Sequence, residues 1–181
     1  IQGMFSEAAQ KKVAESAASV AGIVAAGEVV YGINTGFGAL ADKVINAADT
    51  ATLQYKILQS HSVGVGGALP PLVVRLMLIT KLHALCQGFS GVQPQTVQRM
   101  LWHLEQDVLP FVPEQGSVGA SGDLAPLAHL FLPLIGLGTV WHQGQWKKSK
   151  DVLQAYGLSP ITLGPKEGLA LINGTQFILS Y

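Results

Sequence analysis

The sequence predicts a mainly α-helical protein with minor β-structure. Its long segments repeat apolar residues every three or four positions, as the buried face of a helix does, and clusters of glycine and proline separate them. One short stretch, TVWHQGQWKK, instead has the residue types and central glycine of a β-hairpin. With 181 residues and no internal repeat, the chain is long enough for one domain with a buried core.

The first elements are expected as follows. A helix should cover about 6–26, with Ser6 as its N-cap. Residues 29–31 would be extended and lead into the loop GINTGFG, whose glycines allow close backbone approach. A second helix is expected over about 49–60, and the glycines and prolines between 64 and 71 should then break the chain.

A third helix is expected over 72–87 and should end at Gly88, and a fourth should open at Pro94 and cover about 95–108. Helical spacing places one set of apolar residues on the buried face of the third helix: Leu72, Leu76, Ile79, Leu82 and Cys86. The corresponding set in the fourth helix is Val97, Leu101 and Leu104.

The rest of the chain should form a helix from about Leu124, with Ser121 or Asp123 as its cap, and then the hairpin, turning near Gly144. A short helix over 151–156 and a last helix from about Glu167 should follow. Because the apolar pattern is unfinished at Tyr181, we expect residues 1–181 to be a single portion of a longer domain, truncated at Tyr181.

The composition restricts the partners. Hydrophobic residues make up 49% and charged residues only 12%, about half of the usual charged share of about 25%, so we expect much of the surface to be buried in an oligomer. The net charge is zero with no basic stripe, which argues against nucleic acid. The single cysteine, Cys86, excludes an internal disulfide and fits a reducing, cytoplasmic compartment.

One segment resembles a membrane span, because residues 124–146 contain no Asp, Glu, Lys or Arg. A histidine, two prolines and two glycines interrupt it, which favours a helix buried in a bundle. No cationic segment followed by an apolar run opens the chain, so no signal peptide is expected.

The segment GSVGASGDLAPLAH, residues 116–129, carries the chemistry. Small residues flank Ser121, and the nitrogen of Gly122, uncrowded by a side chain, can attack the Ala120 carbonyl carbon and close a five-membered ring. Loss of two waters then leaves an exocyclic methylene, an electrophile that ordinary side chains do not supply. Taken alone, however, the segment is more typical of a glycine-rich loop followed by a helix cap.

Two further segments, YGINTGFG at 31–38 and KEGLALINGTQ at 166–176, stand in the same order as in a known family. Together with the weaker QSHSVGVG at 59–66 and GFSG at 88–91, they make nearly the whole chain resemble the aromatic amino acid ammonia-lyases and aminomutases. The resemblance implies the N-terminal part of the ammonia-lyase (aspartase/fumarase-like) helical fold, a homotetramer with sites shared between subunits, and a self-formed methylidene-imidazolone from Ala120-Ser121-Gly122. It implies no external cofactor.

The resemblance also assigns roles to single residues. Tyr31 would be the base that removes the β-proton, Asn173 and Gln176 would reach the substrate or the ring from one face of the last helix, and Asp123 would support ring closure. Gly38 and Gly119 would support the site through backbone shape. The remaining histidines lack metal-ligand spacing, so no metal is expected.

Ser60-His61 would select the substrate. Tyrosine-selective members typically carry His-Leu and phenylalanine-selective members Phe-Leu at this place, whereas Ser-His resembles the histidine-specific pattern, so L-histidine would be converted to urocanate. Alternatives stay open: an aminomutase, a tyrosine or phenylalanine lyase, or a non-catalytic binding or oligomerisation fragment. A phosphate-binding role for loops such as GVGG lacks the GxxxxGK[ST] and strand–GxGxxG–helix patterns.

Overall fold

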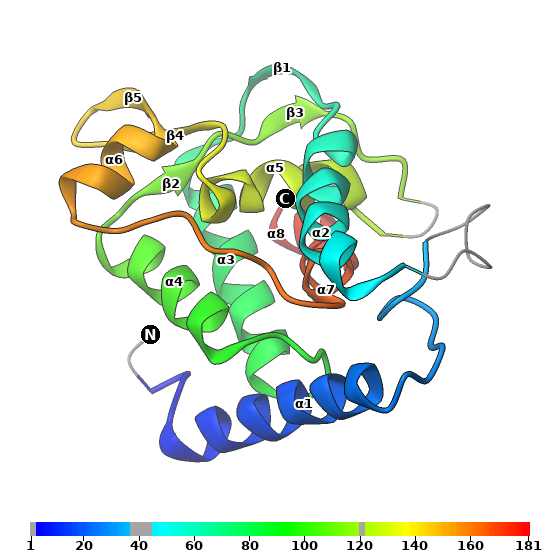
Figure 1. Cartoon of the computed structure of the whole chain (residues 1–181). Coiled ribbons are helices and arrows are strands. Elements are labelled where there is room, and N and C mark those ends of the chain that lie inside the picture. The colour runs from blue at the N-terminus through cyan, green and yellow to red at the C-terminus, as the bar shows by residue number, and fades with distance from the viewer. Residues whose placement is uncertain (1–2, 37–44, 120–121) are drawn as a thin grey trace.

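The computed structural model describes residues 3–36, 45–119 and 122–181. It is mainly helical, with short strands gathered at one end of the molecule and the first helix at the other (Figure 1), which confirms the predicted fold class. One large apolar core, to which α2, α3, α4, α5 and α7 contribute, connects the two ends.

The first two helices begin with side-chain caps. Helix α1 spans Glu7–Ala25, and the hydroxyl of Ser6 accepts a hydrogen bond from the Ala9 amide at 3.4 Å, as predicted. Helix α2 spans Ala47–His61 and is capped by Asn46. Between them, residues 29–31 were expected to be extended; residues 29–30 belong to no helix, strand or turn, and Tyr31 begins a turn across which the Asn34 side chain accepts from the Val30 amide at 2.9 Å.

Helices α3 (Pro71–Cys86) and α4 (Pro94–Glu105) each have proline in the first turn, where its missing N–H costs nothing. The predicted face of α3 is only partly right, since Leu82 and Cys86 are buried but Leu72 is 64% exposed and Leu76 is also exposed. Helix α3 packs against α1, α4 and α8 and is apolar nearly all round, so periodicity alone does not select its buried side.

The expected hairpin is present as β4 (Thr139–His142) and β5 (Gln145–Lys148), and positive φ at Gln143 and Gly144 fits its tight turn. Strand β2 (Leu109–Pro110) pairs with β4, so α4 ends earlier than predicted. The predicted break after α2 contains β1 (Val65–Ala68), which pairs antiparallel with β3 (Pro113–Gln115). Sequence reasoning missed β1, β2 and β3.

Helix α5 (Leu124–Phe131) and the 3₁₀ helix η2 (Leu132–Ile135) lie in the core, where Leu127, Leu130 and Phe131 are fully buried. This burial explains the absence of charged residues over 124–135, whereas the uncharged hairpin residues 143–146 are exposed. Among the described residues, no helix is both long and apolar enough to cross a membrane. Helix α6 (Ser149–Ala155) follows the hairpin, slightly earlier than predicted.

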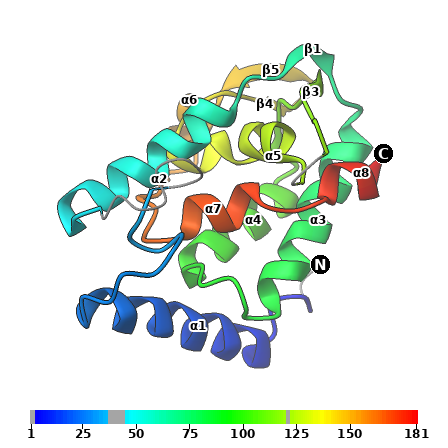
Figure 2. The ribbon, with the colours of Figure 1, turned by 90° about the vertical axis from the view of Figure 1, so that its right-hand side faces the viewer.

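The expected last helix is two helices, α7 (Glu167–Ile172) and α8 (Gln176–Ser180), because Asn173 is extended and Gly174 has φ +157°. Figure 2 shows α7 at the centre of the molecule, between α1 on one side and α2 and α5 on the other. The buried Glu167 carboxylate accepts from the Gln93 amide and the Thr96 hydroxyl, which fixes α7 to the start of α4.

Candidate functional site

The glycine-rich loop before α5 lies against the break between α7 and α8. Gly122 has φ +106°, and a Cβ at this position would lie 2.7 Å from the Gly174 carbonyl oxygen. The same oxygen accepts a hydrogen bond from the Asp123 amide at 2.7 Å. Only glycine fits here without strain. The backbone of the 116–129 segment therefore directly contacts that of the 166–176 segment.

Asp123 connects the loop to the last helix. It occupies the N-cap position of α5, as predicted, but its side chain makes no capping hydrogen bond there. Instead the buried carboxylate accepts from the Ser117 hydroxyl at 2.8 Å and from the Ile178 amide of α8 at 3.2 Å. These two bonds fix the position of Ser117, in the segment that follows β3, relative to Ile178 of α8.

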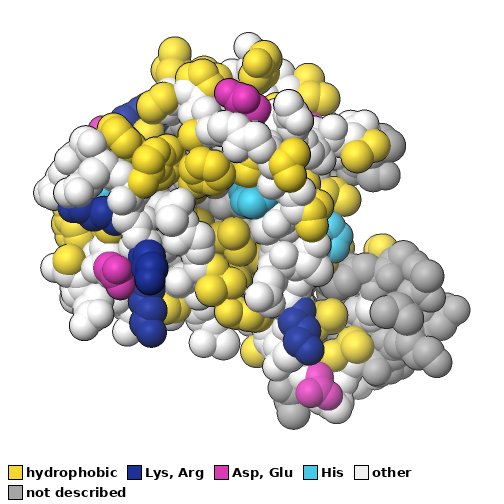
Figure 3. All heavy atoms as spheres, turned by 90° about the horizontal axis from the view of Figure 1, so that it is seen from above, with side chains coloured by type: hydrophobic (Ala, Val, Ile, Leu, Met, Phe, Trp, Pro, Cys, Tyr) yellow, Lys and Arg dark blue, Asp and Glu magenta, His cyan; other side chains and the backbone are white. Residues whose placement is uncertain are grey.

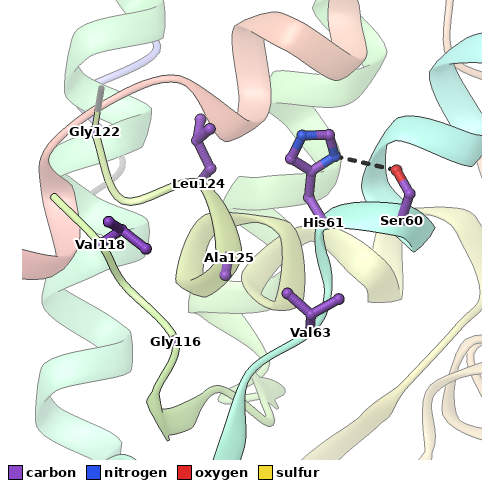
Figure 4. Close-up of a pocket in the computed structure, with 8 residues that line it drawn as sticks. All are labelled: Ser60, His61, Val63, Gly116, Val118, Gly122, Leu124 and Ala125. Atoms are coloured by element: carbon purple, nitrogen blue, oxygen red, sulfur yellow. Dashed lines mark hydrogen bonds between the residues drawn. The ribbon is translucent and has the colours of Figure 1, made fainter. Parts of the chain in front are cut away.

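A cavity of about 300 Å³ lies beside this loop (Figure 4). It is formed by the end of α2, the loop and the start of α5, and its described lining consists of Ser60, His61, Val63, Gly116, Val118, Gly122, Leu124 and Ala125. Of the residues that the sequence predicted for the site, Ser60, His61 and Gly122 therefore share one cavity.

The ring of His61 is oriented by its own helix. Its Nδ1 lies 2.8 Å from the Ile57 carbonyl oxygen and 3.1 Å from the Ser60 hydroxyl (Figure 4). Because a carbonyl oxygen only accepts, this geometry assigns the proton of the neutral ring to Nδ1. The Nε2 atom then carries a lone pair and can accept a hydrogen bond from a donor in the cavity.

His129 binds the backbone next to the cavity lining, and sequence reasoning gave it no role. Its Nε2 accepts from the Gly64 amide at 3.0 Å, next to the lining residue Val63. Burial lowers the pKa of His129, which favours the neutral ring that this bond requires. Its presence in the 116–129 segment was the available signal, but its partner is 65 residues away.

Lys81 is the second residue that sequence reasoning missed. It lies on α3, is only 3% exposed, and donates from Nζ to the Asn173 carbonyl oxygen at 2.7 Å. Burial, and then the charge of Lys166, lowers the pKa of Lys81 to about 7. A lysine inside the apolar run LMLITKLHAL was its signal.

The other predicted site residues that the structure describes are not among the residues that line the cavity. Tyr31 begins a turn and is 59% exposed, while its neighbour Gly32 packs closely on Leu169 of α7. Asn173 is exposed and Gln176 half-buried, and they do not share a helix face as predicted, because the chain breaks between them. Gly119 has φ +73° and lies near Ile178.

Ala120, Ser121 and Gly38 fall outside the described residues. Within residues 3–36, 45–119 and 122–181, no group of three or more His, Cys, Asp or Glu side chains could hold a metal ion. Burial raises the pKa of the Cys86 thiol, as expected for an inert cysteine.

Comparison with known proteins agrees with this architecture. The crystal structure of histidine ammonia-lyase from Trypanosoma cruzi matches with a TM-score of 0.89 and 41% identity, covering 97% of this chain and 34% of that one. Pantoea agglomerans phenylalanine aminomutase matches with a TM-score of 0.89 and 29% identity, covering 95% of this chain and 33% of that one. The fold is therefore that of the ammonia-lyase and aminomutase class.

The family is shown by sequence. The aromatic amino acid lyase family model matches residues 2–181. A histidine ammonia-lyase from Idiomarina loihiensis is 50% identical over 172 residues, covering 95% of this chain and 34% of that protein. The chain belongs to the aromatic amino acid lyase family, and it spans about a third of the length of the relatives it matches.

Proposed function

We propose that the protein containing this chain eliminates ammonia from L-histidine and releases urocanate. The observation that carries the proposal is the cavity in which Ser60 and His61 face the same space as Gly122 of the Ala-Ser-Gly loop. The identities to histidine ammonia-lyases, 50% and 41%, exceed those to a tyrosine aminomutase, 35%, and a phenylalanine aminomutase, 29%, which supports this substrate and reaction over the aminomutase alternative.

The described residues fit a ring formed from Ala120-Ser121-Gly122. In that reaction the Gly122 nitrogen bonds to the Ala120 carbonyl carbon, and the former carbonyl oxygen leaves as water with the protons of the Gly122 and Ser121 nitrogens. A second water takes the Ser121 hydroxyl and its α-proton. Gly122 has a positive φ, and a Cβ on it would lie too close to the Gly174 carbonyl oxygen, so the fold requires glycine at this position. Ring formation favours glycine there as well, because its nitrogen is uncrowded.

The methylidene-imidazolone would supply an electrophilic carbon that binds the substrate amine and improves it as a leaving group, with no external cofactor. Tyr31 would accept the β-proton of the substrate. Asn173 and Gln176 would contact the bound substrate or the ring from the α7–α8 break.

His61 would select the imidazole side chain. With the proton of its ring on Nδ1, the Nε2 atom accepts the N–H of a substrate imidazole, which phenylalanine does not possess. A cavity built around such an acceptor discriminates strongly against substrates that leave it unpaired.

The first test is His61→Leu in the natural, assembled protein. We expect kcat/KM for histidine to fall by about tenfold to a hundredfold, the cost of an unmet hydrogen bond in a cavity, while any activity on phenylalanine does not fall. The matched control is His83→Leu on the exposed side of α3, which should change neither value. Faster turnover of tyrosine or phenylalanine than of histidine by the unaltered protein would contradict the proposal.

The second test is Tyr31→Phe, which removes only the hydroxyl oxygen. If Tyr31 is the base, elimination should slow by about 10²–10⁴-fold, measured as urocanate formed per assembled site. Tyr55→Phe, on α2 and also partly exposed, serves as the control and should retain activity. Full activity of Tyr31→Phe in an assembled protein would defeat the assignment.

The surface supports an assembled state. Figure 3 shows hydrophobic side chains spread over the face with the strands, and Val118 and Ile178 beside the loop are 89% and 61% exposed. Exposed apolar groups around a site are typical of an interface. We propose a homotetramer in the cytoplasm, in which Tyr31 of one subunit serves the Ser121 loop of another.

A further inference from the structure

Lys81 is buried although its amine can carry a positive charge. Within the described parts of the chain, no carboxylate lies within ion-pair distance of its Nζ, and its hydrogen-bond acceptor there is the Asn173 carbonyl oxygen at 2.7 Å. Burying an ammonium group without a carboxylate is costly, and the lowered pKa records this cost. Apolar packing alone does not explain a lysine at this buried position.

The acceptor of Lys81 belongs to the backbone that supports the glycine-rich loop. The Asn173 carbonyl and the Gly174 nitrogen form one peptide group, and a Cβ on Gly122 would lie 3.2 Å from that nitrogen. The next carbonyl, that of Gly174, accepts from the Asp123 amide. Lys81, on α3, therefore holds the Asn173–Gly174 peptide, against which Gly122 packs.

The position of Lys81 also suits the charge that it carries. Asn173 is the C-cap residue of α7, so the ammonium lies near the C-terminal, negative end of that helix. Because Asn173 is extended, its carbonyl lies outside the hydrogen-bond pattern of α7. Figure 2 shows the α7–α8 connection passing beside α3, and α3 packs against α8. A charged donor holds a carbonyl more tightly than a neutral one.

We propose that Lys81 is a positioning residue for ring formation at Ala120-Ser121-Gly122, an inference that rests on the proposed function. Its ammonium fixes the Asn173–Gly174 peptide against Gly122, the residue whose nitrogen forms the new bond to Ala120. Lys81 takes no part in the bond changes and touches no reacting atom. It restrains the backbone so that the attacking nitrogen stays in place.

The test compares Lys81→Met with Lys166→Met in the natural, assembled protein. Lys166 is a matched control, because its ammonium also donates to a backbone carbonyl, that of Ser90, but at the other end of α7. The readout is the cyclised fraction, which is the fraction of the peptide containing residues 116–123 that is lighter by two waters. We expect this cyclised fraction to fall about tenfold or more in Lys81→Met, the value of a charge-assisted hydrogen bond, and not to fall in Lys166→Met.

Two further measurements separate positioning from general stability. Exchange of the Asp123 amide proton, whose acceptor is Gly174, should quicken in Lys81→Met and not in Lys166→Met. Lys81→Arg, which keeps a charged donor, should recover the cyclised fraction.

Four outcomes would overturn the role of Lys81 and leave the proposed function standing. They are equal cyclisation in Lys81→Met and the unaltered protein, equal losses in both methionine variants, failure of Lys81→Met to fold, and no recovery of cyclisation in Lys81→Arg. An unaltered protein that shows no two-water deficit refutes ring formation, which the proposed mechanism requires, and the inference with it.

Discussion

Replacing Ser121 with alanine should reduce elimination of ammonia from histidine by about a thousandfold or more, as removal of a covalent catalytic group does in other enzymes. Alanine has no hydroxyl to lose as the second water, so no exocyclic methylene can form. The effect should fall on kcat, because Ser60, His61 and the rest of the cavity remain to bind the substrate.

The measurement is urocanate production by the assembled Ser121→Ala protein, together with its thermal unfolding. Ser19→Ala, on the exposed side of α1, controls for the substitution itself and should keep full activity. A Ser121→Ala protein that eliminates ammonia at the original rate would show that the loop is structural and not catalytic.

Replacing Gly122 with alanine should have the second largest effect, and it should act on both folding and ring formation. The added Cβ would lie 2.7 Å from the Gly174 carbonyl oxygen, and the residue would have to keep φ +106°. Backbone cannot move aside as a flexible side chain can, so we expect a loss of about 2 kcal/mol or more in the free energy of unfolding. Most of the protein should also lack the two-water deficit.

Gly157→Ala is the matched control for Gly122→Ala. It has a similarly unfavourable φ of +68°, but nothing lies within 4 Å of the Cβ that alanine would add. It should therefore cost only the backbone term, about 1–2 kcal/mol, and allow cyclisation. Equal effects of the two substitutions would mean that contact with Gly174 is unimportant.

The parts of the fold that were predicted correctly have local causes. Ser6 caps α1 and the glycine at 144 turns the β4–β5 hairpin, and both signals lie within a few residues of their effect. Strand β1 pairs Val65 with Gln115, far along the chain, so nothing near 65 indicates it. The Asn173-Gly174 dipeptide was a local turn signal for the α7–α8 break that sequence reasoning passed over.

The site divides in the same way. Motifs located Ser60, His61 and Gly122, which the cavity brings together. The supporting residues could not be predicted, because His129 binds a residue 65 positions away and Lys81 one 92 positions away. Both partners are backbone groups, the Gly64 amide and the Asn173 carbonyl, and every residue has such groups, so no sequence pattern indicates which one will be bound.

The central claim is that the backbone of Ala120, Ser121 and Gly122 closes into a ring. The most direct test is mass spectrometry of the natural, assembled protein, digested to release the peptide that contains residues 116–123. We predict that this peptide is lighter than its sequence requires by the mass of two waters. A peptide of unaltered mass, from protein that nevertheless makes urocanate, would contradict the account.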